Sequence, residues 1–321
     1  MRQKPPRPRK KTLIFRKLKT VGRLSSNIPK RKHFTVIASS YRLSLGQHTR
    51  VMGIVNTTPD SFSQDGCLRK SDETRSTALA LARKHIREGA DIIDIGGEST
   101  RPGAKRVSVK EEINRVLPAI TSLVKKVKIP ISIDTYKPPV AKAALDAGAS
   151  IVNNIMGTKP DLDLLKMIKK YNAAIILMHI RGTPRMMQKN IHYRDLTAEI
   201  VSSLKKSIEK CLEIGIKSDR IIIDPGIGFG KTVEHNLEIL NRLGDFKRLR
   251  RPLLVGTSRK SFIGKVLNKD VRHRLIGTAA SVCASILKGA HIVRVHDVKA
   301  IKEVVTMTDA IINEHYNELS L

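Results

Sequence analysis

Several acidic, amide and basic residues come directly after short runs of apolar residues in this chain. The clearest run is residues 221–223, three isoleucines followed by Asp224 and the turn-forming pair Pro225-Gly226. Such a run is typical of a buried parallel strand, whose carboxyl end here presents a carboxylate to a loop. The polar residues placed in this way are Asn56, Thr100, Arg101, Asp134, Asn153, Asp224, Ser258, Lys260, Arg294 and His296.

The acids and the amide in this set favour a flat ligand that forms hydrogen bonds along one edge. Asp134, Asn153 and Asp224 each end an apolar run, where a carboxylate without a partner is costly to remove from water. Carboxylates accept paired N–H donors well. The three residues therefore predict a site for a heterocycle with an amino-pyrimidinone edge.

The basic and hydroxyl residues form a second group, which favours an anion. Ser258 and Lys260 follow one apolar run, and Arg294 and His296 follow or end another. The loops after the last two strands of an eight-stranded α/β barrel are the usual phosphate site of that fold. The amide oxygen of Asn56 is a suitable ligand for Mg2+, so this residue is the candidate metal ligand.

Residues 226–232 look like the end of a phosphate-binding P-loop but lack a required glycine. That motif needs four residues between its first glycine and the Gly-Lys pair, and the position where this glycine must fall is Pro225. We therefore interpret residues 226–230 as a tight turn that leads into a helix. Lys231 is interpreted as a residue of the helix start.

Eight strand–helix units can position these residues, and the hydrophobic pattern supplies them. Strands are predicted at residues 50–55, 91–95, 130–134, 150–153, 174–178, 220–224, 252–256 and 291–295. Helices are predicted at residues 73–88, 109–126, 138–147, 162–171, 196–214, 234–243, 274–288 and 299–315. This order predicts an α/β fold, a single (β/α)8 TIM barrel whose strand ends converge on one face. A doubly wound sheet is the alternative, although no glycine-rich phosphate turn opens the first unit.

The first 50 residues differ in composition from the rest of the chain. The net charge is +31, and residues 1–50 contain 15 Lys and Arg but no Asp or Glu. We predict that residues 1–33 form a basic, disordered extension and that residues 34–321 form one catalytic domain. Residues 34–48 are predicted as a strand or hairpin, with Gly46 at the turn, that covers the bottom of the barrel.

The composition leaves three interpretations of the basic extension open. It is a solvated tail, a nonspecific binder of nucleic acid or anionic surfaces, or a transit peptide. No apolar run approaches the roughly 20 residues that span a bilayer. The three cysteines Cys67, Cys211 and Cys283 are far apart in the sequence, which is typical of incidental thiols in a reducing compartment.

From about residue 50 to its end, the chain resembles the dihydropteroate synthases, a pterin-binding family of the folate pathway. The resemblance depends on seven segments in the expected order, at residues 52–63, 89–104, 133–136, 178–179, 224–240, 258–260 and 294–296. It implies a (β/α)8 transferase, usually a homodimer, that joins p-aminobenzoate to 6-hydroxymethyl-7,8-dihydropterin pyrophosphate with Mg2+ as cofactor. Because no fused pyrophosphokinase domain is found, a bacterial cytoplasmic enzyme is expected.

By position, the resemblance gives each candidate residue a role. The residues that would hold the pterin are Asp134, Asn153, Asp224 and Lys260. Those that would hold pyrophosphate with Mg2+ are Asn56, Arg294 and His296. Those near the leaving group and p-aminobenzoate are Thr100, Arg101 and Ser258, and those that would wall the pocket are Met178 and Phe229. The residues expected to carry catalysis are Asp224, Lys260, Arg294 and His296.

Two positions depart from the family pattern. The family loop usually has an acid directly after Ser-Phe-Ser, where this chain has Gln64 followed by Asp65. Family members often have Asn-Asp after the fourth strand, where this chain has Asn153 and Asn154. Binding through Asn153 is expected to survive the second change.

Two other functions are weighed against the synthase. A pterin-binding methyltransferase acting on methyltetrahydrofolate would share the pterin acids but has less need of the anion-binding groups around Arg101, Lys260 and Arg294. A basic nucleic-acid-binding protein would depend on residues 1–33, and its binding would weaken with salt. The acids and the anion-binding residues together favour the synthase.

Overall fold

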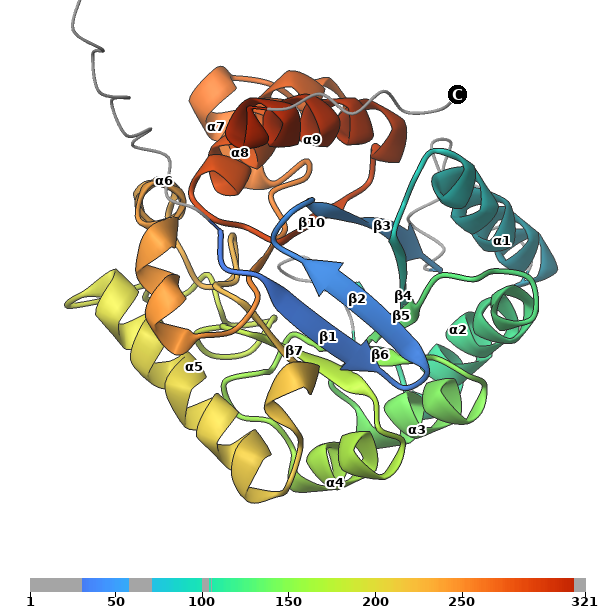
Figure 1. The fold of residues 1–321 in the computed structure, drawn as a ribbon. Coiled ribbons are helices and arrows are strands. Elements are labelled where there is room, and N and C mark those ends of the chain that lie inside the picture. Colours follow the sequence, from blue (N-terminus) through green and yellow to red (C-terminus); the bar gives the residue numbers. More distant parts are fainter. Residues whose placement is uncertain (1–30, 58–70, 100–103, 105, 315–321) are drawn as a thin grey trace, which may run out of the picture.

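The apolar runs form eight parallel strands that close into a barrel, with helices around it (Figure 1). The computed structural model describes residues 31–57, 71–99, 104 and 106–314. The strands lie in the order β8-β7-β6-β5-β4-β3-β10-β9, and a parallel bridge between Ile223 and Leu253 joins the two ends of this order. The closed barrel confirms the (β/α)8 prediction and excludes the doubly wound sheet.

The observed elements end within two residues of the predicted ones. The barrel strands are β3 (Arg50–Asn56), β4 (Ile92–Gly96), β5 (Ile131–Asp134), β6 (Ile151–Asn154), β7 (Ala174–Met178), β8 (Ile221–Asp224), β9 (Leu254–Val255) and β10 (Ile292–Val295). The helices predicted from the sequence are α1 (Ser71–Arg87), α2 (Val109–Val124), α3 (Pro138–Asp146), α4 (Leu162–Lys170), α5 (Leu196–Glu213), α6 (Val233–Asn241), α8 (Leu275–Leu287) and α9 (Val298–Asn313).

One α-helix was not predicted. It is α7, which spans Ser261–Leu267 and begins directly after Lys260. The helix has seven residues, contains Gly264 and has no side-chain hydrogen bond at its N-cap, so it lacks both a clear apolar period and a capping signal. The described residues also form the 3-10 helices η2 (Ser218–Arg220), η3 (Leu243–Leu249) and η4 (Val271–His273).

Successive strand residues alternate between the surrounding helices and the barrel interior. On β8, Ile221 and Ile223 belong to the apolar cluster that the strands form with the helices. Ile222, between them, belongs to a second cluster inside the barrel. Ile92, Ile151 and Ile292 occupy the same interior level on their own strands: they all belong to that second cluster.

A hairpin covers the amino end of the barrel, as predicted (Figure 1). Its strands are β1 (Phe34–Ala38) and β2 (Tyr41–Leu45), and they bury Val36 and Leu43 against the interior cluster. The predicted turn was wrong, because the strands are joined at residues 39–40, where Ser39 has a φ of 53°. Gly46 instead follows β2 with a φ of 115°, in a conformation that favours glycine.

Within the described part of the basic extension, Arg31 forms an ion pair with α9. Arg31 is buried, and its Nη2 lies 2.6 Å from Oδ1 of Asp309 on α9. Residues 1–30 lie outside the described part, so their disorder and the predicted domain limits stay predictions. Among the described residues, no helix is both long and apolar enough to cross a membrane.

Candidate active site at the carboxyl end of the barrel

The alternation along the strands brings five polar residues into the upper interior of the barrel. Each of them lies two positions further along its strand than a residue at the lower interior level. These lower residues are Ile92, Ser132, Ile151, Ile222 and Ile292. Because side chains repeat with period two in a strand, these five residues also point inward. They are Asp94, Asp134, Asn153, Asp224 and Arg294.

Arg294 connects two of these acids. Its Nε donates to Oδ2 of Asp94 at 2.6 Å, and its Nη2 donates to Oδ2 of Asp134 at 2.6 Å. The Asp94 side chain is fully buried, and the Arg294 side chain is 20% exposed. A guanidinium fork suits two acceptors of this kind. Arg294 therefore faces both the acids below it and the open end of the barrel.

Two carboxylate oxygens remain without partners in this cluster. Among the described residues, Oδ1 of Asp94 and Oδ1 of Asp134 are buried and accept no hydrogen bond. Burial raises the pKa of Asp134 to about 7, against the opposing effect of Arg294. An unsatisfied buried acceptor is unfavourable, so these oxygens are suited to accept N–H groups from a ligand.

Asp94 is the functional residue that the sequence reasoning missed in this cluster. It lies within the apolar segment Ile92–Gly96, and the polar tip was sought only after that segment. Nδ2 of Asn153 donates to its Oδ2 at 3.1 Å. The signal was present in the sequence, because an acid flanked on both sides by isoleucine in a buried strand requires partners.

Asp224 is held by the turn that follows it. Its Oδ1 accepts a hydrogen bond from the backbone N–H of Gly226 at 2.7 Å, and its carbonyl oxygen accepts one from the backbone N–H of His179 at 2.9 Å. Burial raises the pKa of Asp224, and the nearby Lys260 opposes this rise. Gly226 has a φ of 71°, and a Cβ there would lie 1.8 Å from the His179 oxygen. The site thus requires glycine at position 226.

Lys260 crosses from the end of β9 to the same turn. Its Nζ donates to the carbonyl oxygen of Ile227 and lies 4.8 Å from the centre of the Phe229 ring. Burial lowers the pKa of Lys260 to about 8, although Asp224 favours its charged form. The ammonium group is thus placed among an acid, a carbonyl oxygen and an aromatic ring.

Ser258 and His296 form a pair across two neighbouring strand ends. The backbone N–H of His296 donates to Oγ of Ser258 at 3.1 Å, and the same Oγ lies 3.0 Å from Nδ1 of the imidazole. With its oxygen accepting from the backbone, the hydroxyl is able to donate to Nδ1. This arrangement favours the tautomer with its proton on Nε2.

Lys231 was assigned to the helix start, and the structure corrects this assignment. Helix α6 begins at Val233 with Thr232 as its N-cap, whereas the Lys231 side chain is buried. Its Nζ lies 3.0 Å from Nδ1 of His179 and donates to the carbonyl oxygen of Phe229 at 2.9 Å. Burial lowers the pKa of Lys231 to about 7 and holds that of His179 well below 6.5. The buried amine of Lys231 thus connects the turn at residues 226–230 with His179.

Apolar side chains border this polar interior on one side. Met178 belongs to a small buried cluster with Ile155, Ile180 and Met187, and Phe229 packs against that cluster. Both predicted wall residues are therefore brought together. A flat ring bound between the acids and this cluster would contact apolar surface on its face and polar groups on its edge.

The remaining predicted residues lie at the rim or outside the described part of the chain. Asn56 ends β3 opposite Gly96, and a Cβ built at Gly96 would lie 3.6 Å from Oδ1 of Asn56 and 3.5 Å from Cβ of Asp134. Thr100, Arg101, Gln64, Asp65 and Cys67 fall outside the described residues. In the described part, no group of three or more His, Cys, Asp or Glu side chains is arranged to hold a metal ion.

A second buried ion cluster supports the loop that precedes residue 100. Nζ of Lys137 donates to Oε2 of Glu112 at 2.6 Å and also binds Glu98. Oε1 of Glu112 accepts from Thr135, directly after β5, at 2.8 Å. This cluster was not predicted from the sequence, because its members come from three separate segments.

The chain matches known proteins over most of its length. Residues 52–296 match the family model described as pterin binding enzyme. The dihydropteroate synthase of Synechocystis is 48% identical over 267 residues, which are 83% of this chain and 91% of that protein. That of Bacillus subtilis is 47% identical and covers 85% of this chain and 92% of that protein. The Xanthomonas albilineans dihydropteroate synthase with 4-aminobenzoic acid has a TM-score of 0.80 at 37% identity and covers 88% of this chain and 99% of that one.

Proposed function

This chain belongs to the pterin binding enzyme family, and from that premise we propose how the upper interior of its barrel carries out dihydropteroate synthesis. The chain is a transferase of folate biosynthesis. It condenses 6-hydroxymethyl-7,8-dihydropterin pyrophosphate with p-aminobenzoate to give 7,8-dihydropteroate and pyrophosphate. The observation that carries the mechanism is the cluster of Asp94, Asp134 and Arg294, because it combines free acceptors for the pterin with a cation for the leaving anion.

The pterin is proposed to bind with its polar edge on the acids. Oδ1 of Asp94 and Oδ1 of Asp134 have no partner among the described residues and are able to accept pterin N–H groups. Asp224 offers a further carboxylate on the other side, with Lys260 near it as a donor. Asn153 holds Asp94 in place through its amide. Met178 and Phe229 supply the apolar surface for the ring face.

The pyrophosphate is proposed to lie above Arg294, against His296 and Ser258. The guanidinium of Arg294 has five N–H donors, and its bonds to Asp94 and Asp134 use two of them. The favoured tautomer of His296 presents Nε2–H as a donor. Fixed donors of this kind stabilise the negative charge that develops on a leaving phosphate.

Bond cleavage precedes bond formation in the proposed route. The C–O bond between the pterin methylene and pyrophosphate breaks and leaves its electron pair on the pyrophosphate oxygen. The methylene carbon of the resulting cation then accepts the amine lone pair of p-aminobenzoate, and the amine loses one proton. Asp134 and Asp224 favour the cationic pterin electrostatically. No protein nucleophile is required.

Mg2+ is proposed as the cofactor, with Asn56 as its protein ligand. Magnesium is commonly held by one or two protein oxygens together with substrate phosphates, and the position of Asn56 beside Gly96 and near Asp134 is compatible with that chemistry. When bound, the ion would neutralise charge on the pyrophosphate. The contribution of this chain would be the amide oxygen of Asn56 beside Gly96.

A homodimer is also proposed, with helices α6, α7 and α8 as its contact surface. These helices pack against one another and expose large apolar side chains, of which Ile276 is 77% and Val266 is 55% exposed. The others are Leu237, Leu267 and Leu275. Because a cluster of exposed apolar residues marks an interaction surface, a second copy of the chain is the proposed occupant.

A cytoplasmic location is proposed from the cysteines and from the pathway. Cys211 is buried, Cys283 is partly buried, and both are free thiols, as expected in a reducing compartment. Binding of nucleic acid by the basic extension stays a separate prediction, and it would be nonspecific.

The pterin assignment is tested by calorimetric titration with the unreactive ligand 6-hydroxymethylpterin. Asp134→Asn removes one acceptor while keeping the size of the side chain, and we expect at least about tenfold weaker binding. Asp146→Asn, an exposed change on α3, serves as the matched control. Equal affinity in both variants would remove Asp134 from the pterin site.

A further inference from the structure

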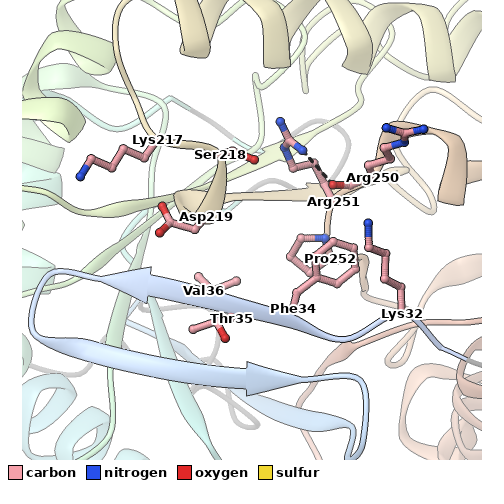
Figure 2. Close-up of a pocket in the computed structure, with 10 residues that line it drawn as sticks. All are labelled: Lys32, Phe34, Thr35, Val36, Lys217, Ser218, Asp219, Arg250, Arg251 and Pro252. Atoms are coloured by element: carbon pink, nitrogen blue, oxygen red, sulfur yellow. Dashed lines mark hydrogen bonds between the residues drawn. The ribbon is translucent and has the colours of Figure 1, made fainter.

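A pocket of ≈ 550 Å3 lies at the amino end of the barrel, away from the active site (Figure 2). It is bordered by β1 of the hairpin, by η2 and by Arg250-Arg251-Pro252. η2 and Pro252 come just before the strands β8 and β9. The residues of the catalytic cluster lie on the upper parts of the strands, so the pocket is separated from them by the barrel core.

Basic side chains predominate in this pocket. Lys32, Lys217, Arg250 and Arg251 line it together with a single acid, Asp219. None of the four basic groups forms an ion pair with a carboxylate of a described residue, although many other Lys and Arg side chains in the described chain do. The pocket therefore holds an excess of positive charge that the described protein does not neutralise.

Three of the four cations border one end of the pocket. Figure 2 shows Lys32, Arg250 and Arg251 at that end, whereas Lys217 points away from them. Arg250 is held in the left-handed region with a φ of 51° as the residue that ends η3. Its carbonyl oxygen accepts a hydrogen bond from Nη1 of Arg251 at 2.8 Å. The backbone thereby orients the second guanidinium.

Arg251 has a donor that the described protein leaves unused. Its Nε is buried and has no hydrogen-bond partner among the described residues. Burial also lowers the pKa of this guanidinium, and the side chain as a whole is half-buried. Buried donors normally have partners, and a phosphate oxygen suits a guanidinium better than most other acceptors.

An apolar wall lies beside these cations. The rings of Phe34 and Pro252 form it, and Nζ of Lys32 lies 5.4 Å from the centre of the Phe34 ring. Ser218 and Asp219, farther from the three cations, offer oxygen atoms that accept hydrogen bonds from hydroxyl or amino groups. A pocket of this volume accommodates a small molecule. The lining therefore fits an anion with an organic part attached to it.

We propose that this pocket is a binding site for a small organic polyphosphate of the nucleoside di- or triphosphate class. Its phosphates bind Lys32, Arg250 and Arg251, and its organic part lies against Phe34 and Pro252. Lys32 itself belongs to the basic extension predicted from the sequence, residues 1–33.

The proposal is tested by calorimetric titration of the full-length protein with ATP and, separately, with inorganic triphosphate. The variant R250S/R251S removes two of the three cations that face the phosphates, and we expect at least tenfold weaker binding of both ligands. K205S/K206S removes two charges from exposed residues of α5 and serves as the matched control, with binding within twofold of wild type. Thermal denaturation and synthase turnover check that both variants fold.

Each outcome decides the proposal. Tighter binding of ATP than of triphosphate supports contact with the organic part, and equal binding would contradict the contact with Phe34 and Pro252. Equal losses in both double variants would show general charge attraction and overturn the site. Loss of binding in Arg294→Ala, with the pocket intact, would place the anion in the active site instead. Binding of an RNA oligonucleotide through Arg250 and Arg251, without binding of ATP, would replace the proposal with a nucleic-acid surface.

Discussion

Nη2 of Arg294 donates to Oδ2 of Asp134 across 2.6 Å, so a residue assigned to the leaving anion is paired with one assigned to the pterin. The same guanidinium also holds Asp94. Because one cation contacts both acids, the proposed positions of the pterin and of the pyrophosphate are coupled. A change at Arg294 is therefore expected to affect both substrate binding and the chemical step.

Arg294→Ala is expected to lower kcat/KM by at least about tenfold, the effect of roughly 1.4 kcal/mol of lost transition-state stabilisation. The variant loses a donor to the leaving anion and removes the cation that is paired with Asp94 and Asp134. Steady-state measurement of pyrophosphate release provides the rate. Arg248→Ala, an exposed change on η3, is the control and should keep wild-type turnover. Wild-type kinetics in Arg294→Ala would exclude its assigned role.

Lys231→Met is expected to change the way that stability depends on pH. The pKa of Lys231 is lowered to about 7 in the folded protein, so the unfolded chain binds more protons than the folded one between about pH 7 and pH 10.5. The wild type therefore gains stability as the pH rises through this window, and the methionine variant lacks that gain. His179 is the titratable group in contact with Lys231, and it stays neutral because its pKa is well below 6.5.

Urea denaturation at pH 6 and pH 9 measures this effect. The free energy of unfolding of the wild type minus that of Lys231→Met should be larger at pH 9 than at pH 6. Lys205→Met, an exposed change on α5, should give the same difference at both pH values. A Lys231 difference that does not vary with pH would contradict the assignment of a buried amine with a lowered pKa.

Gly226→Ala is expected to destabilise the protein and to disable the site. The added Cβ would lie 1.8 Å from the His179 oxygen, at a φ of 71°, and strain of this kind costs about 1–3 kcal/mol or more. The turn that holds Asp224 would shift, so turnover should fall as well. Gly244→Ala is the control, because the nearest atom to its Cβ lies 4.0 Å away. Equal melting temperatures for the two variants would contradict the close approach.

Ile276→Glu is expected to weaken self-association. Ile276 is 77% exposed on α8, within the apolar surface that α6, α7 and α8 share. Burying a charge in a dimer contact without a partner is unfavourable. Size-exclusion chromatography with light scattering should give a dimer for the wild type and a monomer for Ile276→Glu. Met307→Glu, at a residue 63% exposed on α9, should remain a dimer, and a monomeric wild type would contradict the proposed surface.

The sequence predicted the barrel well because the relevant signals are local. Period two in the strands and the apolar runs are visible within a few residues, so Asp134, Asn153, Asp224 and Arg294 were placed at one end of the barrel correctly. The pairing of Arg294 with Asp94 joins positions 200 residues apart, and no local pattern encodes it. Asp94 was missed because only the residues after each apolar run were considered.

Lys231 shows a different limit of prediction from sequence. Its neighbours in the chain suggest the start of a helix, and α6 does begin two residues later. Its buried contact with His179, however, comes from β7 and its loop, 52 residues earlier in the chain. The hairpin turn was misplaced for a related reason: glycine is the stronger local turn signal, yet Ser39 adopts the positive φ at the turn.

The most direct test of the account is pyrophosphate release by the purified protein in the presence of Mg2+ and 6-hydroxymethyl-7,8-dihydropterin pyrophosphate, with and without p-aminobenzoate. Release should depend on p-aminobenzoate, and one 7,8-dihydropteroate should form for each pyrophosphate. Tight binding of the pterin without p-aminobenzoate-dependent release would contradict it and would instead favour a pterin-binding methyltransferase.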